Sequence, residues 1–149
     1  MKLFVTLSRR TLAVIFAITV IVAVFILWFE SVNRTYSDGS TNEIRMNYLK
    51  SLGIYANDDN AQSKEIVIPE KFGDVYTRYN KIQKAANFDL SNFKGQNATV
   101  YTYPLMNGEY LAHIIVHDGK IIGGDIASTK LNGNMYPLVR KWQNAEVSE

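Results

Sequence analysis

Two histidines are the residues of this chain whose type and spacing most suggest a metal site. His113 and His117 are four positions apart. On a helix, this spacing places both imidazoles on one face, where they can chelate one ion. On a strand, it separates them by about 13 Å, because each residue advances about 3.3 Å. The segment is strand-like, so we expect no metal site, and we expect each histidine to be structural.

The chain also lacks the residue sets that nucleophilic catalysis requires. It has no cysteine, no G-x-S-x-G sequence and no obvious base near Ser128. Gly119-Lys120 does not complete a phosphate-binding loop, because Ile114 stands where such a loop has glycine. Asp125 follows two glycines and is a candidate functional carboxylate, but a carboxylate alone makes no acid–base pair. We therefore expect a protein that is not an enzyme and binds no cofactor.

Tyrosines give the clearest candidate binding surface. Tyr101, Tyr103 and Tyr110 are expected to cluster on one face of a sheet, opposite the second helix of the domain. Exposed tyrosines of this kind often contact a protein or a sugar polymer. The alternative is that they reflect strand propensity and are partly covered by the first helix. The candidate binding residues, including the glycine-rich segment, are Tyr101, Tyr103, Tyr110, Gly123, Gly124 and Asp125.

An uncharged run of nineteen residues, Thr11–Phe29, indicates where these residues are placed in the cell. As a helix it is about 28 Å long, close to the hydrocarbon thickness of a bilayer. A cleaved secretory signal is one alternative, but such signals have a shorter apolar core and end in small residues. This run ends in Trp28 and Phe29. A buried core helix is another alternative, but rarely lacks a polar face over this length. We expect an uncleaved, single-pass membrane anchor.

The distribution of charge predicts the orientation of this anchor. Lys2, Arg9 and Arg10 precede the run, and no acidic residue does. The positive-inside rule therefore keeps the N-terminus in the cytoplasm and places residues 30–149 outside the cell membrane. The whole chain has a net charge of +2, from 16 basic and 14 acidic residues. Removing the three N-terminal basic residues leaves 13 against 14, or −1, so the outer part gives no electrostatic case for nucleic acid.

The chain is expected to form one small domain behind its anchor. We assign residues 1–10 to a cytoplasmic end, 11–29 to the anchor, 30–40 to a linker, 41–138 to the domain and 139–149 to a polar tail. A first helix is predicted over about Thr41–Leu52, where Ser40 and Glu43 have capping-box spacing. Lys64–Ile68 is predicted to be a strand, and Pro69 to lie in the first turn of a second helix.

Three further strands are predicted to form an antiparallel meander, which makes the domain α+β. They are Ala98–Tyr103, Tyr110–His117 and Lys120–Ser128, joined through the turns Asn107-Gly108 and Asp118-Gly119. With a two-residue second turn, Val116 faces Ile121 and Ala112 faces Asp125. The second helix is expected to cover an aliphatic core face, and Gly123-Gly124 to allow its close approach or to make a bulge. That aliphatic face comprises Val100, Leu111, Ile115, Ile122 and Ile126. The opposite face comprises Tyr101, Tyr103, Tyr110, Ile114 and Ile121.

Several short sequences in this domain resemble an uncharacterised bacterial family, the domain of unknown function 4830. They are Pro69-Glu70-Lys71-Phe72, Val75-Tyr76, Tyr79-Asn80, Gln83, Phe88-Asp89-Leu90-Ser91, Lys94-Gly95, Tyr101-Thr102-Tyr103 and the run from Asp118 to Asp125. The resemblance covers roughly residues 43–138 and implies a small anchored protein of Gram-positive bacteria with no known activity. Members often carry a cysteine shortly after the aspartate, where this chain has Ala127 and Ser128. More loosely, the helix and meander are similar to PepSY modules, some of which restrain peptidases.

Three functions remain open from the sequence. The first is a non-enzymatic protein-interaction module at the cell envelope, anchored through Thr11–Phe29 and facing outward, with an unidentified protein partner. The second is a PepSY-like regulator or inhibitor of an extracellular peptidase, which the resemblance implies. The third is a small ligand-binding or enzymatic domain that uses Asp125 and the tyrosine face. A deep pocket at Asp125 would favour the third, and a flat sheet face the first.

Overall fold

The computed structural model describes residues 9–32 and 36–144. The chain divides into two units, one ending at Thr35 and one beginning at Tyr36. Most of the predicted cytoplasmic end, part of the predicted linker and the last five residues of the predicted tail lie outside the described residues. The two units are therefore considered separately.

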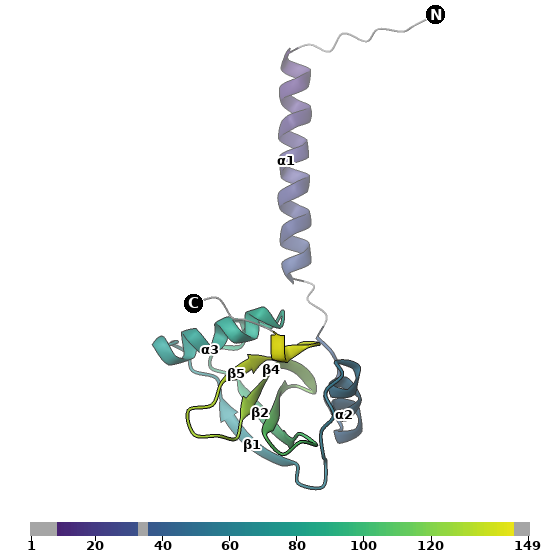
Figure 1. Cartoon of the computed structure of the whole chain (residues 1–149). Coiled ribbons are helices and arrows are strands. Elements are labelled where there is room, and N and C mark those ends of the chain that lie inside the picture. The colour runs from purple at the N-terminus through teal and green to yellow at the C-terminus, as the bar shows by residue number, and fades with distance from the viewer. Residues whose placement is uncertain (1–8, 33–35, 145–149) are drawn as a thin grey trace, which may run out of the picture. The chain divides into compact units, whose positions relative to one another are not determined.

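The first unit contains one helix, α1, Arg9–Val32, of 24 residues (Figure 1). It includes the whole uncharged run, so the predicted helix is confirmed, while its insertion into a membrane stays a prediction. Its apolar side chains are exposed, namely Leu12, Val14, Ile15, Phe16, Ile18, Val20, Ile21, Val22, Val24, Phe25 and Ile26. Within the described part of the chain, no helix meets both the length and the apolarity that crossing a membrane requires.

The second unit is built on one antiparallel sheet of five strands, which confirms the predicted α+β class (Figure 1). The strands follow one another in space in the order of the sequence, β1-β2-β3-β4-β5. Their bounds are β1 Gln62–Val67, β2 Asn97–Pro104, β3 Tyr110–His117, β4 Lys120–Ser128 and β5 Met135–Pro137. The predicted meander is thus the centre of a larger sheet, because the predicted strand before Pro69 joins one edge and β5 joins the other.

Two helices belong to this unit. Helix α2, Asn42–Ser51, matches the predicted first helix, although the capping side chain is Thr41, which accepts a hydrogen bond from the Ile44 amide, and not Ser40. Helix α3, Asp74–Ala85, begins five residues after the predicted start at Pro69. The prediction was wrong because Ile68, directly before Pro69, still pairs with the β2 side through its N–H and the Gln96 carbonyl, at 2.9 Å, and the helix is capped only at Gly73. Two short 3₁₀ segments, η1 Leu90–Phe93 and η2 Trp142–Asn144, complete the elements.

One extra residue in β4 changes which side chains share a face of the sheet. Val116 pairs with Ile121, as predicted, but Ile115 pairs with Gly123, so Ile122 has no direct partner and forms a bulge. Ala112 consequently faces Ile126, and the predicted pairing of Ala112 with Asp125 is wrong. The bulge moves Ile126 to the tyrosine face and Asp125 to the opposite face, because side chains alternate along a strand.

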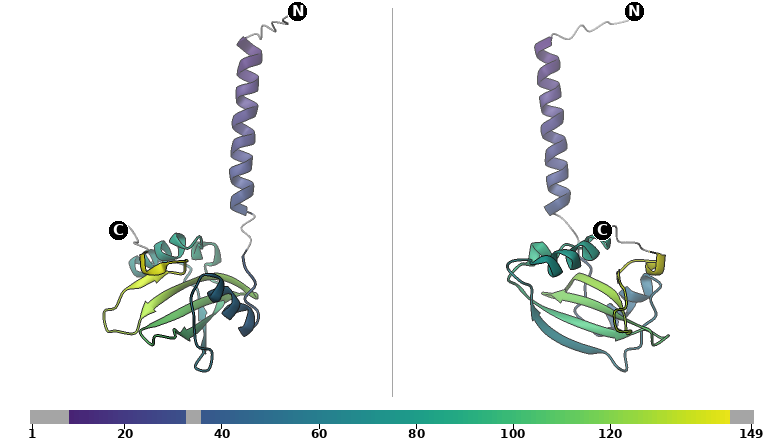
Figure 2. Two further views of the ribbon diagram at one scale, coloured as in Figure 1. Left: turned by 45° about the vertical axis from the view of Figure 1, so that its right-hand side comes forward. Right: turned by 60° about the vertical axis from the view of Figure 1, so that its left-hand side comes forward.

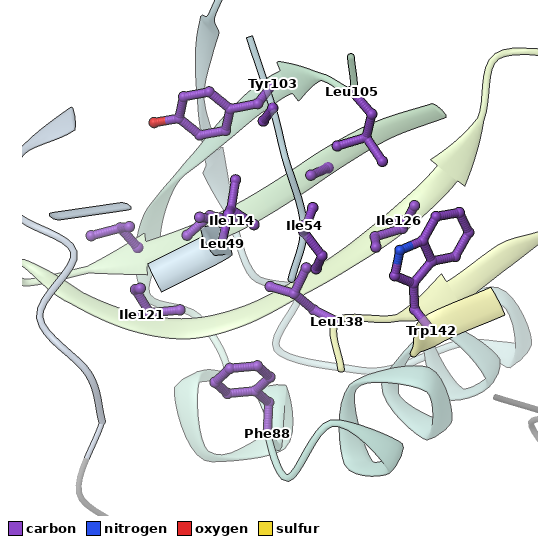
Figure 3. Packing of buried hydrophobic residues seen from close by; sticks show 13 residues of the cluster. Leu49, Ile54, Phe88, Tyr103, Leu105, Ile114, Ile121, Ile126, Leu138 and Trp142 are labelled. Carbon is purple, nitrogen blue, oxygen red and sulfur yellow. The ribbon is translucent and has the colours of Figure 1, made fainter. Parts of the chain in front are cut away.

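The larger hydrophobic cluster lies on the tyrosine face, beneath α2 (Figure 3). This corrects the expectation that the aliphatic face is the main core. Its buried members are Leu49, Ile54, Ala56, Phe88, Tyr103, Leu105, Ala112, Ile114, Val116, Ile121, Ile126, Leu138 and Trp142. The bulge enlarges this cluster by turning Ile126 into it.

A smaller cluster lies on the other face, where α3 packs as predicted (Figure 2). Its buried members are Ile68, Leu90, Ala98, Ile115 and Ile122, and partly buried aromatic side chains of α3 pack against them. The sheet is therefore buried on both faces, and the polar groups that join α3 to it lie in a largely dry environment.

The folded unit extends beyond both predicted boundaries of the domain. On the N-terminal side, the Gly39 N–H donates to the Gly119 carbonyl and the Ile121 N–H donates to the Ser37 carbonyl, each at 2.8 Å. On the C-terminal side, Trp142, which was assigned to a polar tail, is only 5% exposed and packs in the larger cluster. The described fold thus begins at the short pairing of residues 37–39 with the start of β4.

Candidate functional site

A buried carboxylate is the centre of the most developed polar site in the second unit. Asp125, on β4, is 1% exposed. Its Oδ2 atom accepts a hydrogen bond of 2.6 Å from the hydroxyl of Tyr79, on α3. Its Oδ1 atom lies 2.8 Å from Nδ1 of His113, on β3. One carboxylate therefore joins a helix and two strands.

The bulge and the glycine pair place this cluster. His113 pairs directly with Asp125 across β3 and β4, so both side chains project to the α3 face. The Gly124 N–H donates to Oε1 of Gln83 at 2.8 Å. A Cβ atom at Gly123 would lie 2.8 Å from the same oxygen. Gly123 thus allows the close approach of α3 that the sequence predicted, whereas the bulge falls on Ile122 and both glycines are paired with β3.

Gln83 leaves one polar atom in this region without a partner. The residue is fully buried, and its Oε1 atom is used by Gly124. Within the described residues, its Nε2 atom is the buried side-chain polar atom that makes no hydrogen bond. A buried donor without an acceptor costs about 1–3 kcal/mol, so the junction of α3 and β4 is not fully satisfied by protein groups alone.

The electrostatics of the cluster favour hydrogen bonds directed at Asp125. Burial, together with the neighbouring Asp125 carboxylate, raises the pKa of Tyr79, so its hydroxyl stays protonated and donates. A carboxylate accepts hydrogen bonds, so this contact suits the His113 tautomer with its proton on Nδ1, and in that neutral tautomer Nε2 is the acceptor of the ring. The His113 side chain is 20% exposed and is the route from this cluster to solvent.

Asp125 and His113 correspond to the carboxylate and the histidine of a catalytic triad. A carboxylate that orients a histidine is the arrangement that prepares Nε2 to take a proton. In the described part of the chain, however, His113 makes its hydrogen bond to Asp125 and none to a hydroxyl group. The site can orient an imidazole and hold a proton at Nε2, but it presents no nucleophile of its own.

The three candidate tyrosines are packed within the unit, so the predicted alternative, partial cover by the first helix, is confirmed and an exposed tyrosine face is not. Tyr103 is fully buried; its hydroxyl accepts from Nε of Arg45 and donates to Oδ1 of Asn42, both at 2.8 Å. The guanidinium of Arg45 lies 3.5 Å from the centre of the Tyr101 ring. Tyr110 is half-buried against Trp142. Helix α2 and the C-terminal segment provide the cover.

The two histidines have separate partners, as their strand spacing predicted. Nδ1 of His113 is used by Asp125, whereas Nδ1 of His117 lies 2.7 Å from the Asn97 carbonyl oxygen. Among the described residues, no group of three or more acidic or histidine side chains is arranged to hold a metal ion.

Sequence reasoning found Asp125 but missed its partners. Tyr79 looked like one member of the apolar stripe of a helix, and His113 like an isolated structural residue. The spacing of Tyr79 and Gln83 is the one sequence signal that could have indicated a polar contact between α3 and the sheet. It places two side chains with polar ends on one face of α3. Without the bulge, however, the strand pattern places Asp125 on the opposite face of the sheet.

No protein-family model, no curated protein and no solved structure matches this chain. A fold of this class also hosts many unrelated functions. Function is therefore argued from the residues and geometry of this chain.

Proposed function

We propose that this protein is a membrane-tethered interaction module whose folded unit lies outside the cell and binds a protein partner without catalysis. The observation that carries the proposal is the surface of α1. Successive residues of a helix point about 100° apart. The exposed apolar side chains of Leu12, Val20, Ile21 and Val22 therefore point in all directions around the axis. A helix that is apolar all round needs an apolar environment.

The dimensions of α1 support a bilayer as that environment. As a helix, the uncharged run Thr11–Phe29 has a length of about 28 Å, and a bilayer core is about 30 Å thick. Within α1, side chains are described as far as Ile26. The sequence after Ile26 remains uncharged as far as Phe29. Arg9 and Arg10 at the start of the helix favour a cytoplasmic N-terminus.

Binding is favoured over catalysis by the groups that are present. The His113 ring makes no hydrogen bond to a hydroxyl group in the described residues, and the fold is otherwise a packed sheet with a free edge at β1. A domain presented by a tether needs only a complementary surface to recruit a partner. The proposal therefore requires a stable fold, membrane attachment and one accessible surface.

Membrane attachment is tested with the full chain in a bacterial host. A reporter that is active only outside the cytoplasm, fused after Glu149, should be active, and the protein should resist extraction by alkaline carbonate. Introducing charge through Ile18→Lys together with Val22→Lys should release the protein from the membrane fraction. The matched variant, Ile18→Leu with Val22→Leu, should remain attached. A reporter that is active only when inside the cell, or a full-length protein in the carbonate supernatant, would refute the tether.

Partner binding is tested separately by crosslinking in intact cells. A photoreactive side chain placed on the outer unit should give a defined adduct that is absent when the unit is deleted and α1 is kept. Adducts obtained equally with α1 alone would show that the folded unit does not recruit the partner.

A second candidate function is a small-ligand or acid–base site at His113. The specific observation is the 2.8 Å contact between its Nδ1 atom and Asp125, which orients Nε2. If this function is correct, His113→Gln should abolish the cellular phenotype while the purified unit stays folded and still gives the crosslinked adduct. If the interaction module is correct, His113→Gln should leave both the phenotype and the adduct intact.

A further inference from the structure

β1 is one of the two edge strands of the sheet, and its free edge is exposed. β1 stands at the end of the sheet and pairs only with β2. Five of its six residues are exposed, and Ile66 is half-buried. At about 3.4 Å per residue, this edge is roughly 20 Å long. Such an edge presents unpaired backbone groups to which another strand can bind.

The backbone pairing identifies which groups of β1 point outward. The Ile68 N–H donates to the Gln96 carbonyl, and the Gly95 N–H donates to the Ile68 carbonyl, so Ile68 faces the β2 side. N–H and C=O groups alternate in direction along an antiparallel strand. The backbone groups of Ser63, Glu65 and Val67 therefore point away from the sheet and are available to an added strand.

A groove of about 420 Å³ lies beside this edge. It is lined by residues 65–67, 97–99 and 116–118, which belong to three neighbouring strands and the turn that follows them. Glu65 pairs with Thr99, and Thr99 pairs with Val116, so these three side chains project to the same face. The adjacent row contains Tyr101, which Arg45 covers. The groove thus opens where the covered part of this face ends.

The groove is acidic and has apolar walls. Glu65 and Asp118 line it, and its lining residues include no lysine or arginine. Asp118 is 3.4 Å from the ring of His117, while the salt bridges of the described residues do not include Glu65. Val67, which is 61% exposed, stands two residues from Glu65 on the same face. This combination suits a cationic side chain with an aliphatic stem.

A second copy of this chain is a poor occupant of the edge. In an antiparallel pair related by two-fold symmetry, one residue must lie opposite itself. The two longest registers, over Gln62–Ile66 and over Ser63–Val67, are centred on Lys64 and on Glu65, respectively. Each places like charges directly opposite one another, which is destabilising. The charges of β1 therefore favour a different partner sequence.

We infer that the partner binds as an extended peptide that adds to β1 as a sixth, antiparallel strand and places an arginine or lysine opposite Glu65, in the groove. The neighbouring peptide residue, on the other face, lies opposite Lys64 and is acidic, and the residue opposite Val67 is apolar. This inference rests on the proposed function, because it specifies how the outer unit binds its protein partner. Backbone bonds supply affinity, and the groove supplies specificity.

The test uses the chain from Tyr36 to Glu149, which forms a separate compact unit containing both hydrophobic clusters. The probe is the labelled peptide acetyl-Val-Thr-Arg-Glu-Thr-Gln-amide, whose antiparallel register sets its arginine opposite Glu65. Binding is measured by fluorescence anisotropy. Backbone NMR shifts should change at Ser63, Glu65 and Val67. A peptide in which arginine and glutamate are exchanged should bind about threefold to tenfold more weakly, because it sets like charges opposite Glu65 and Lys64.

Charge reversal provides the matched control. Glu65→Lys should weaken the first peptide about threefold to tenfold and strengthen a peptide with glutamate in the arginine position. Glu109→Lys, at an exposed position in another turn, should change neither affinity. No binding at millimolar peptide, equal affinities for all peptides, or shifts confined to other strands would overturn the inference. A crosslinked adduct in cells that persists in Glu65→Lys would also overturn it while leaving the proposed function standing.

Discussion

The Nδ1 atom of His113 lies 2.8 Å from the Oδ1 atom of Asp125, across two neighbouring strands. Tyr79 binds the other carboxylate oxygen from α3. Because Asp125 is almost completely buried, the first consequence of this relationship concerns folding stability. Removing the carboxylate leaves two polar groups without their acceptor in a dry environment.

Asp125→Ala should lower the free energy of unfolding of the unit by about 2–6 kcal/mol, because two donors lose their acceptor and each costs about 1–3 kcal/mol. Asp125→Asn should cost less, because an amide oxygen can still accept one of the two hydrogen bonds. Urea denaturation followed by circular dichroism measures both losses. Asp58→Ala, at an exposed position, is the control and should change stability little. An Asp125→Ala loss equal to that of Asp58→Ala would contradict the buried network.

Gly123→Ala should destabilise the unit by about 1–3 kcal/mol, because the new methyl group meets Oε1 of Gln83 at 2.8 Å and forces α3 away from the sheet. Thermal unfolding of purified protein measures this effect. Gly73→Ala is the comparison, since nothing lies within 4 Å of its added Cβ atom. Its expected cost is about half a kcal/mol or less. Equal losses at the two positions would mean that α3 does not approach β4 closely.

Arg45→Lys should cost about 1–2 kcal/mol of stability. The guanidinium bonds to Tyr103 and to the Gly39 carbonyl while it covers the Tyr101 ring, and an ammonium group cannot reproduce this geometry. Arg78→Lys tests the same chemical change where the arginine is exposed on α3 and should have almost no effect. Denaturant midpoints compare the two variants. If Arg45→Lys left the stability unchanged, the hydrogen bonds from Arg45 to Tyr103 and Gly39 would not be what holds α2 in place.

Acid should weaken the fold partly through Asp89. Partial burial acts to raise the pKa of this carboxyl group, but hydrogen bonds from Asn80 and Ser91, with the Lys84 cation nearby, outweigh it and bring the pKa down to about 2. A lowered pKa in the folded state gives stability that is complete above the unfolded value, near 3.8, and is lost as pH falls towards 2.

Comparing wild type with Asp89→Asn isolates this contribution from the other carboxylates. The difference in unfolding free energy between the two proteins should be constant above about pH 4 and should shrink between pH 4 and 2. Urea denaturation at a series of pH values measures it. A difference that stayed constant down to pH 2 would show that the pKa of Asp89 is not lowered by folding.

The sequence predicted those elements whose signals are local. The turns Asn107-Gly108 and Asp118-Gly119 lie between strands close to the predicted ones, because these dipeptides favour tight turns. The first helix was found from its cap and its apolar period. The start of α3 was missed, because Pro69 is compatible with a first helical turn and equally with an extended segment that pairs with Gln96. Only the pairing with a distant strand decides between them.

The candidate site was harder to predict because it depends on a shift of one residue in the pairing of β3 with β4. Without the bulge at Ile122, alternation places Asp125 beside the tyrosines and away from His113. The local sequence Ile121-Ile122-Gly123-Gly124 does not predict which of its residues forms the bulge. The outcome depends on the contacts of both faces, including the hydrogen bond from Gly124 to Gln83. For the same reason, the cover of Tyr103 by α2 could not be read from the strand sequence.

The entry of the chain into the folded unit at Tyr36 has a mechanical consequence. Any pull on the segment that precedes Tyr36 reaches the sheet first through residues 37–39, whose backbone makes two bonds to Gly119 and Ile121. Such a short pairing yields at low force when it is peeled from one end, whereas the long β2, β3 and β4 pairings bear load together. Such a pull should therefore detach residues 37–39 from the start of β4 before the sheet itself opens, exposing the Ile121 amide and the Gly119 carbonyl.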